Sequence, residues 1–341
     1  MNEFELIRHF FAQQPPQLPA GHPDSQLPVH FDTSCAAAVS SSLLLGIGDD
    51  CALLDAPAPG QVLAVSSDML VEGRHFFHGT DPAAIGHKAL AVNLSDLAAM
   101  GAQPVGFTLA LALPAVDEDW LASFSKAMLA LASRAACPLV GGDTTRGLLT
   151  ISVTVMGQVP AGQALRRDGA RAGDDIWVSG ELGAAALAVA QRQQGLPVDA
   201  LAAQRLDWPM PRLAAGIALR GIASAAMDIS DGLAGDLGHL LSASGRCCGQ
   251  SLGAELMASA LPLAAPLHAL PQAEALHHAL HGGDDYELLF TAPPDRAATI
   301  SRLLPEARRV GRIIAGRAIL LLDDNGRQHP VGAFGHDHFA S

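Results

Sequence analysis

Aspartates recur at one kind of place in this sequence, directly after a short apolar run and beside glycine or serine. Five segments share this pattern: Gly48-Asp49-Asp50, Ser66-Ser67-Asp68, Gly141-Gly142-Asp143, Asp228-Ile229-Ser230-Asp231-Gly232 and Gly282-Gly283-Asp284-Asp285. A further aspartate, Asp96, interrupts an apolar stripe in a segment with helical spacing. Taken alone, an aspartate at such a place is more often a turn or helix N-cap residue than part of a functional site. Their repetition predicts that carboxylates from distant segments meet at one edge, provided that the strands share a sheet.

Carboxylates gathered in this way repel one another, at a cost on the order of 4 kcal/mol for a pair ~4 Å apart at an effective dielectric constant of about 20. Divalent cations would neutralise the cluster, and the all-oxygen ligands, with Ser66 and Ser67 beside the aspartates, suit Mg²⁺, Mn²⁺ or Ca²⁺. Mg²⁺ keeps positions open for phosphate oxygens. The residues therefore favour phosphoryl transfer.

Competing chemistries lack their motifs. The sequence has no GxxxxGK[ST], no GxGxxG after a strand, no HExxH and no GxSxG. The segment Ser179-Gly180-Glu181-Leu182-Gly183 could direct backbone N–H groups at an anion, but it is more typical of a tight strand-to-helix turn.

Short apolar runs and helical segments alternate from Leu43 onward, which predicts an α/β or α+β fold. Strands are expected at Leu43–Ile47, Gln61–Val65, Val105–Leu113, Pro138–Val140, Leu149–Val159, Asp175–Ser179, Ala225–Ile229 and Tyr286–Thr291. Helices are expected at Pro82–Met100, from the N-cap Asp117 through Ala136, at Leu182–Gln193 and at Leu233–Ser244.

Two domains are expected, an N-terminal domain of residues 1–160 and a C-terminal α/β domain of residues 161–341. The boundary is placed at the polar stretch Pro160–Asp174. Residues 13–42 are rich in Pro, Ser, Ala and Gln without any period, so they are expected to form a flexible surface insertion.

Composition excludes several classes of protein. A net charge of −13 argues against general nucleic-acid binding, because a phosphate backbone is held by clustered Lys and Arg. No apolar run approaches the ~20 residues that cross a bilayer, so no membrane insertion is expected. The five cysteines form no CxxC pair, and the first residues are acidic where a signal peptide would be basic. Reduced thiols in a cytoplasmic protein are expected.

Six collinear segments resemble the thiamine-monophosphate kinase family, within the superfamily of aminoimidazole ribonucleotide synthetase. They are GIGDD (Gly46–Asp50), SSDMLVEGRHF (Ser66–Phe76), KALAVNLSDLAAMGA (Lys88–Ala102), GGDTTRG (Gly141–Gly147), MDISDGL (Met227–Leu233) and GGDDYELLFT (Gly282–Thr291). The resemblance runs from about Phe4 to Phe339. It implies ATP-dependent phosphorylation of thiamine monophosphate to thiamine diphosphate, by direct in-line transfer with several Mg²⁺ ions.

The resemblance also implies roles for particular residues. The expected metal ligands are Asp50, Ser66, Ser67, Asp68, Asp96, Asp143, Asp228 and Asp231, of which Asp68, Asp143 and Asp228 are the expected catalytic residues. The expected ATP-binding residues are Gly142, Asp143, Arg167 and Ser230, with Arg166 as the alternative to Arg167. The expected thiamine-phosphate contacts are His75, Asp284, where the family often has Glu, and His336, where it usually has an aromatic residue.

The fold that the resemblance implies has two α/β domains, with the N-terminal sheets of two subunits pairing into a barrel across a homodimer. Two other functions stay open on the residues alone. One is another ATP-dependent synthetase of the superfamily, although no cysteine lies in an N-terminal glycine-rich loop, which argues against selenium chemistry. The other is a non-catalytic acidic module that binds Ca²⁺ or Mg²⁺ without turnover.

Overall fold

The computed structural model describes residues 3–11, 43–47 and 50–332. The chain divides into two compact units, one of residues 1–97 and 102–162 and the other of residues 98–101 and 163–341. The expected insertion at 13–42 and the expected substrate contact His336 lie outside the described residues. Among the described residues, no helix is long and apolar enough to cross a membrane.

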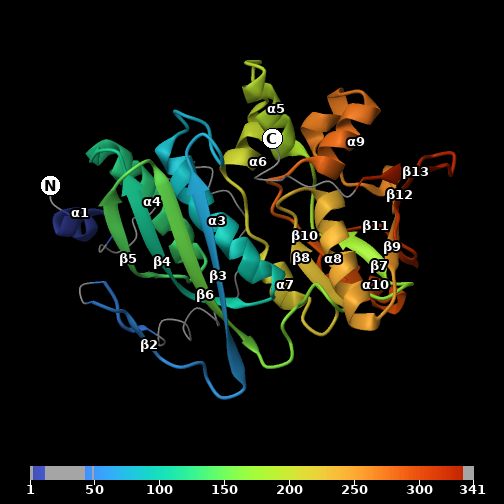
Figure 1. Ribbon diagram of the computed structural model, residues 1–341, viewed down its shortest axis with the longest axis horizontal. Coiled ribbons are helices and arrows are strands. Elements are labelled where there is room, and N and C mark those ends of the chain that lie inside the picture. Colours follow the sequence, from blue (N-terminus) through green and yellow to red (C-terminus); the bar gives the residue numbers. More distant parts are fainter. Residues whose placement is uncertain (1–2, 12–42, 48–49, 333–341) are drawn as a thin grey trace. The chain divides into compact units, whose positions relative to one another are not determined.

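The first unit contains a four-stranded sheet in the order β3-β6-β4-β5 (Figure 1). Its strands are β3 (Gln61–Val71), β4 (Gln103–Leu113), β5 (Leu139–Arg146) and β6 (Thr150–Pro160). β6 pairs antiparallel with both β3 and β4, whereas β4 and β5 are parallel. The short strands β1 (Leu43–Leu45) and β2 (Leu53–Leu54) form a separate antiparallel pair. The helices are α1 (Glu3–Phe10), α3 (Pro82–Ala99) and α4 (Glu118–Arg134).

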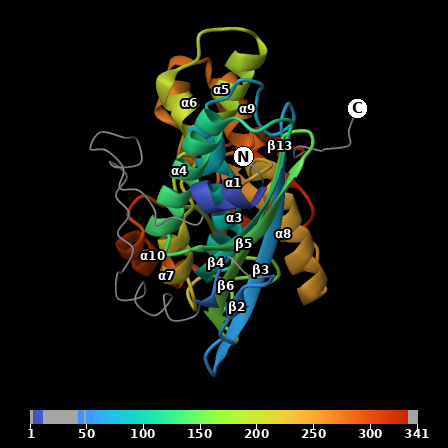
Figure 2. The ribbon, with the colours of Figure 1, turned by 90° about the vertical axis from the view of Figure 1, so that its left-hand side faces the viewer.

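One face of this sheet is buried and the other is not. Along β6, buried and partly exposed residues alternate strictly, with Ile151, Val153 and Val155 fully buried. A Cβ atom on Gly157 would lie 2.9 Å from a side-chain carbon of Leu97, so α3 packs closely on the buried face. Helices α3 and α4 can be followed beside the strands in Figure 2. The first unit therefore consists of a sheet with helices on one side.

Helix α4 begins where the sequence predicts. Asp117 has an extended backbone, and its carboxylate accepts the N–H of Trp120 at 3.0 Å, which satisfies a donor that the helix itself leaves unpaired. Pro82 is the first residue of α3, where its missing N–H costs little.

The second unit contains a seven-stranded sheet in the order β13-β12-β9-β11-β7-β10-β8. The strands are β7 (Asp175–Val178), β8 (Ala225–Asp228), β9 (Leu252–Met257), β10 (Leu288–Ala292), β11 (Arg308–Ala315), β12 (Ile319–Leu322) and β13 (Gln328–Val331). The helices are α5 (Ala184–Gln193), α6 (Ala200–Asp207), α7 (Leu213–Ala218), α8 (Leu233–Cys248), α9 (Gln272–His281) and α10 (Ala297–Leu303), with short 3₁₀ turns at Ala258–Ala260, Ala265–Ala269 and Pro294–Arg296. All neighbouring strands are antiparallel except β9 and β12.

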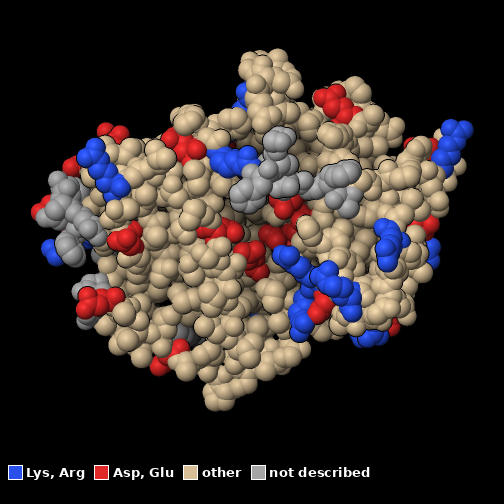
Figure 3. Space-filling model, viewed as in Figure 1, with Lys and Arg blue, Asp and Glu red and all other residues tan. Residues whose placement is uncertain are grey.

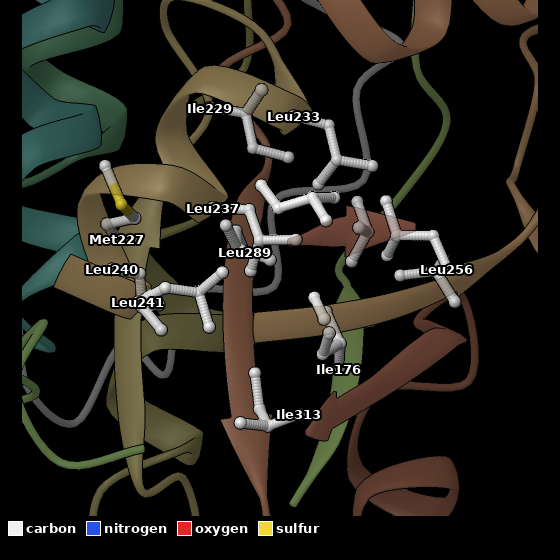
Figure 4. Packing of buried hydrophobic residues seen from close by; sticks show 14 of the residues in the cluster. Ile176, Met227, Ile229, Leu233, Leu237, Leu240, Leu241, Leu256, Leu289 and Ile313 are labelled. Atoms are coloured by element: carbon white, nitrogen blue, oxygen red, sulfur yellow. The ribbon is translucent and has the colours of Figure 1, made fainter. Parts of the chain in front are cut away.

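The core of the second unit forms between this sheet and α8. Leu233, Leu237, Leu240 and Leu241 recur at helical spacing on α8 and are buried in one cluster with residues of the sheet such as Leu289 (Figure 4). Because the N-terminus of α8 directly follows the Asp228–Gly232 segment, this packing fixes the position of that acidic segment on the sheet.

Two expectations about the strands are wrong. Strand β3 continues to Val71 because it pairs with β6 over its whole length, and β5 continues to Arg146, so Asp68 and Asp143 lie within strands and not after their ends. The acidic strands also belong to two different sheets, since β3 and β5 are in the first unit and β8 is in the second.

Candidate functional site

The first group of candidate residues lies where β3 meets α3. Ser66 and Asp68 are two residues apart on β3, so their side chains lie on the same face of the strand. The Ser66 hydroxyl donates a hydrogen bond to the carboxylate of Asp96 on α3. Burial, together with the negative charge of Asp96, raises the pKa of Asp68 to about 6. Two carboxylates and a hydroxyl therefore meet in one partly buried place.

Asn93 supports this first group, although it is not among the candidate residues expected from the sequence. Its side chain is fully buried; Oδ1 accepts the backbone N–H of Asp68 at 3.0 Å, and Nδ2 donates to the carbonyl of Ala89 at 2.9 Å. Asn93 precedes Asp96 by three residues and so lies on the same side of α3. That spacing was the available signal, because a buried amide beside a carboxylate in an apolar helix needs a specific partner.

Ser67 does not join this group through its hydroxyl. The pleat of β3 directs its side chain to the opposite face, where the hydroxyl bonds to the Val153 carbonyl at 3.1 Å and to the Thr154 hydroxyl at 2.9 Å. The hydroxyls of Ser66 and Ser67 therefore lie on opposite faces of β3, and the role of Ser67 as a metal ligand stays a prediction.

Gly142 and Asp143 lie on the other edge strand of the same sheet. The strand register aligns Asp68 with Val153, Val153 with Leu109 and Leu109 with Gly142. Three strand spacings separate the ends of this row, a distance of about 14 Å. Asp143 is exposed. The sheet thus places Asp68 and Asp143 at one level without bringing their carboxylates into contact.

The close approach of β4 to β5 explains why position 142 is a glycine. Its φ is +152°, and a Cβ atom there would lie 1.9 Å from the carbonyl oxygen of Leu109. Any side chain would push β5 away from β4, so the residue before Asp143 must be glycine for this sheet to form.

His75 and Asp50 occupy loops of the first unit. His75 Nδ1 accepts the backbone N–H of Val71 at 3.0 Å, and the His75 N–H donates to the Val71 carbonyl at 2.9 Å. An accepting Nδ1 places the ring proton of the neutral imidazole on Nε2. Asp50 is exposed in a bend between β1 and β2.

The second group lies at the end of β8 and the start of α8. Asp228 is the last residue of β8 and is buried, while Ser230 and Asp231 are partly exposed in the connection that follows. The backbone N–H groups of Ser230 and Asp231 both donate to Oδ2 of Asp236, each at 3.1 Å. Burial raises the pKa of Asp236 to about 7, and the charges of Asp231 and Asp228 add to that rise.

The Gly282–Asp285 segment meets this second group, as the repeated pattern predicts. The N–H of Asp284 donates to the Ser230 carbonyl at 2.9 Å, and the N–H of Tyr286 donates to the Ile229 carbonyl at 2.9 Å. Asp284 and Tyr286 both have left-handed backbones, with φ of +66° and +50°. A non-glycine residue rarely adopts this conformation, and two such residues so close together mark a loop that the surrounding bonds hold in place.

A buried ion pair beneath that loop also escaped the sequence analysis. Glu287 is 1% exposed; it accepts a hydrogen bond from the Ser179 hydroxyl and a bidentate pair from the Arg212 guanidinium, one arm of which is 2.7 Å from Oε2. Asp285 accepts the N–H of Gly183 at 3.0 Å. The bonds of Glu287 to Ser179 and of Asp285 to Gly183 connect the acidic loop to the turn after β7. This is the segment for which the sequence favours a strand-to-helix turn.

Arg166 and Arg167 differ in their surroundings. Arg166 forms a bidentate ion pair with Asp168, with Nε 3.0 Å and Nη2 2.5 Å from its two carboxylate oxygens. Arg167 is exposed, and its carbonyl accepts the hydroxyl of Ser244 at 2.7 Å. Within the described part of the chain its guanidinium has no ion-pair partner, which favours Arg167 over Arg166 as the arginine available to a ligand.

The oxygen-only donors of both groups suit a hard divalent cation such as Mg²⁺. Across residues 3–11, 43–47 and 50–332, no three His, Cys, Asp or Glu side chains are already arranged to hold a metal ion. Much of the surface visible in Figure 3 is neither acidic nor basic, in keeping with only 16% charged residues. The candidate carboxylates are thus specific groupings on a protein with few charged residues.

Comparison with known proteins identifies close relatives. Residues 48–159 match the family described as AIR synthase related protein, N-terminal domain. The thiamine-monophosphate kinase of Salmonella typhimurium is 47% identical over 306 residues, which cover 87% of this chain and 92% of that protein. The corresponding Escherichia coli enzyme is 45% identical over 309 residues, again covering 87% of this chain and 92% of that protein.

Solved structures of thiamine-monophosphate kinases are also similar to this chain. A thiamine-monophosphate kinase from Stenotrophomonas maltophilia has a TM-score of 0.77 and 44% identity, covering 88% of this chain and 98% of that one. A structure described as AaThiL complexed with AMPPCP and TMP has a TM-score of 0.73 and 30% identity, covering 86% of this chain and 92% of that one. The hydrogenase maturation protein HypE, at 22% identity and a TM-score of 0.68, shares the fold.

Proposed function

The chain belongs to the thiamine-monophosphate kinase family, and on that premise we propose that it transfers the terminal phosphoryl group of ATP to thiamine monophosphate, producing thiamine diphosphate and ADP. The acceptor is already a phosphate oxygen, so the reaction needs no strong general base. Positioning of the two reactants and neutralisation of their charge supply most of the catalysis in phosphoryl transfer. The chain is rich in groups for those two tasks and has no covalent nucleophile motif.

The observation that carries this proposal is the pairing of Asp68 with Asp96. Two carboxylates held together in a partly buried place, one of them with its pKa raised to about 6, are destabilised until a cation joins them. We therefore assign Asp68 and Asp96, with the Ser66 hydroxyl, to Mg²⁺ binding in the first unit. Bound Mg²⁺ would neutralise phosphate oxygens and orient them.

The remaining site residues are assigned by motif. We assign Asp50 and Asp143 in the first unit, and Asp228 and Asp231 in the second, as further metal ligands, with Asp68, Asp143 and Asp228 central to catalysis. Gly142, Asp143, Arg167 and Ser230 are assigned to ATP. His75 is assigned to the phosphate of thiamine monophosphate through its Nε2 side, because Nδ1 already accepts from Val71. Asp284 is assigned to the same substrate.

A direct assay tests the proposal. Purified protein is incubated with ATP, thiamine monophosphate and MgCl₂, and thiamine diphosphate and ADP are quantified by chromatography. The two products are expected in equal amounts, with none when Mg²⁺ is chelated or when unphosphorylated thiamine replaces the monophosphate. Folded protein that binds Mg²⁺ but forms neither product would instead support a non-catalytic acidic module, and ADP without thiamine diphosphate would indicate another acceptor.

We also propose that two copies of the chain associate through the open face of the β3-β6-β4-β5 sheet. On that face of β3, Leu63, Val65 and Met69 are 52%, 58% and 56% exposed. Isolated apolar residues are ordinary at a surface, but a row of them along one strand face indicates an interaction surface. A second copy of the same face would cover them and pair the two sheets.

A cytoplasmic location is proposed as well. Cys51, Cys137, Cys247 and Cys248 are all free thiols in the described part of the chain. Neighbouring exposed thiols such as Cys247 and Cys248 persist best where the surroundings are reducing.

A further inference from the structure

We propose that Asp236 is a positioning residue that fixes the loop directly before α8 so that the loop offers side-chain oxygens to a cation, an inference that rests on the proposed kinase function. Asp236 does not touch a reacting atom in this proposal. It acts by holding the backbone of Ser230 and Asp231, so that their oxygen-bearing side chains, together with Asp228, are presented to a metal-bound nucleotide.

The hydrogen bonds define the role. Successive backbone N–H groups that point the same way ordinarily attract a phosphate or another anion. Ser230 and Asp231 carry two such groups, directly before Gly232, the N-cap of α8. Here Oδ2 of Asp236 already accepts the N–H groups of Ser230 and Asp231, both at 3.1 Å, and the Asp236 N–H donates to the Gly232 carbonyl at 3.0 Å. The carboxylate of the chain itself therefore occupies the place that an external anion would take.

The rest of the segment is held from the other side. The N–H of Ile229 donates to the Glu287 carbonyl at 2.8 Å, and the Ser230 carbonyl accepts the N–H of Asp284 at 2.9 Å. Backbone groups on both sides of Ser230 are thus paired within the protein. The side chains of Ser230 and Asp231, both partly exposed, remain the features that this segment presents outward.

The position of Asp236 is costly for the fold. Its side chain is among the buried charged groups, with the residue only 2% exposed, and its acidic neighbours are Asp228 and Asp231. It has no ion-pair partner among the described residues. An apolar residue would avoid burying a charge, but it would leave the N–H groups of Ser230 and Asp231 without this acceptor. The hydrogen bonds that hold the loop therefore account for a polar side chain here.

The test compares two substitutions of similar size. Asp236→Asn keeps an oxygen that accepts from the two N–H groups, whereas Asp236→Leu keeps the branched shape, with the same number of side-chain heavy atoms, and removes the acceptor. Asp174→Leu is the matched control, because Asp174 is also buried and also accepts a backbone N–H, that of Arg171 at 3.0 Å, but it precedes β7 and packs against Ser224 at the opposite end of β8 from Asp228.

The first readout needs no activity. Amide hydrogen exchange of Ser230 and Asp231 is measured in the ligand-free proteins. We expect exchange at these two amides to be at least tenfold faster in Asp236→Leu and within about twofold of wild type in Asp236→Asn and Asp174→Leu. Unchanged exchange in a folded Asp236→Leu protein would overturn the proposal, whether or not the protein is a kinase.

The second readout is the rate of thiamine diphosphate formation as a function of MgCl₂ concentration. We expect Asp236→Leu to lower kcat at least tenfold and to require more Mg²⁺ for half-maximal rate, and Asp236→Asn to stay within about threefold of wild type. Asp174→Leu is expected to lower Tm without changing the Mg²⁺ dependence. Equal kinetics in the Asn and Leu variants would overturn the positioning role.

The experiments distinguish a failure of the proposed role of Asp236 from a failure of the proposed kinase function. Absence of turnover by wild-type protein counts against the kinase and leaves the exchange comparison standing. If Asp236→Leu does not fold, the Asn variant decides alone: wild-type exchange and Mg²⁺ dependence support the proposal, and a tenfold loss of kcat despite the retained acceptor contradicts it.

Discussion

The carboxylate of Asp68 lies close enough to that of Asp96 for the second charge to add to burial in raising the pKa of Asp68 to about 6. The two residues come from different elements, a strand and a helix, and the Ser66 hydroxyl donates to the Asp96 side of the pair. A protein gains no stability from such a pair of like charges in the absence of a cation. Their proximity is therefore the feature of the fold that most directly indicates metal binding.

Replacing Asp96 with Asn should lower the pKa of Asp68 towards its ordinary value, because the negative charge that opposes ionisation is removed while burial remains. A carbon-13 NMR titration of the Asp68 carboxyl in Mg²⁺-free buffer measures this. The exposed Asp119→Asn variant, in the first turn of α4, is the control and should leave the Asp68 titration unchanged. A pKa that stays at about 6 in Asp96→Asn would show that burial alone causes the shift.

Replacing Asp68 with Asn should separate activity from stability. We expect kcat to fall at least 100-fold, equivalent to about 2.7 kcal/mol of transition-state stabilisation, because a charged ligand to the metal is lost. In Mg²⁺-free buffer at pH 8, where Asp68 is ionised, Tm should rise by a few degrees, since the repulsion with Asp96 disappears. Differential scanning calorimetry and the product assay measure the two effects. A near-normal kcat would contradict the metal assignment.

The meeting of acidic segments could be predicted in part from the sequence, because glycine and serine beside aspartate mark turns and places where backbones approach closely. The meeting of the Asp228–Asp231 and Gly282–Asp285 segments follows that logic and is confirmed by the bond between Asp284 and Ser230. Asp96 was recognisable as a carboxylate that interrupts an apolar helix, and the structure gives it a partner in Ser66.

Other features depend on pairing that no local pattern encodes. The length of β3 is set by its antiparallel register with β6, whose paired residues are 79 (Val71 and Thr150) to 99 (Gln61 and Pro160) positions away along the chain. Strand alternation then separates the Ser67 hydroxyl from Ser66 and Asp68. Likewise, Asp236 accepts the backbone N–H of Ser230, and Glu287 pairs with Arg212. The partners of Glu287 and Asp236 could not be identified from local spacing. Local spacing thus predicted that two of the acidic segments meet, but not which of their atoms bond to one another.

Replacing Arg167 with Ala should raise the KM for ATP about tenfold with a smaller change in kcat. The variant loses a guanidinium that is proposed to bind phosphate in both the ground and the transition state and that forms no ion pair with any residue the structure describes. Arg166→Ala is the matched control. Arg166 is already committed to Asp168, so its loss should change the KM for ATP less than twofold. Steady-state kinetics with ATP varied at saturating thiamine monophosphate distinguish the variants, and the reverse order of effects would assign the nucleotide to Arg166.

Replacing Asp285 with Asn should alter how stability depends on pH. Burial, reinforced by the charges of Glu287 and Asp284, raises the pKa of Asp285 well above its usual value. The folded state then keeps this proton to a higher pH than the unfolded state does, so the contribution of Asp285 to stability falls as pH rises above about 4, by at most about 1.4 kcal/mol per pH unit. Asn carries no titrating proton.

The difference in Tm between Asp285→Asn and wild type should therefore grow in favour of the variant from pH 5 to pH 8. Thermal unfolding followed by circular dichroism at each pH measures it. Asp199→Asn is the control, because Asp199 is an exposed N-cap of α6 that accepts two N–H groups. A difference that is constant across this range would mean that Asp285 titrates alike in the folded and unfolded states.

Replacing Val65 with Glu should convert the proposed dimer into a monomer. Val65 is 58% exposed in the middle of the apolar row on β3, and a carboxylate buried there against a second copy would be unpaired. Light scattering coupled to size-exclusion chromatography should give twice 35.2 kDa for wild type and 35.2 kDa for the variant at micromolar concentration. Leu201→Glu, an equally exposed leucine (55%) on α6 of the other unit, should leave the mass unchanged. If wild-type protein is monomeric throughout this concentration range, the open face of the sheet is not where two copies of the chain meet.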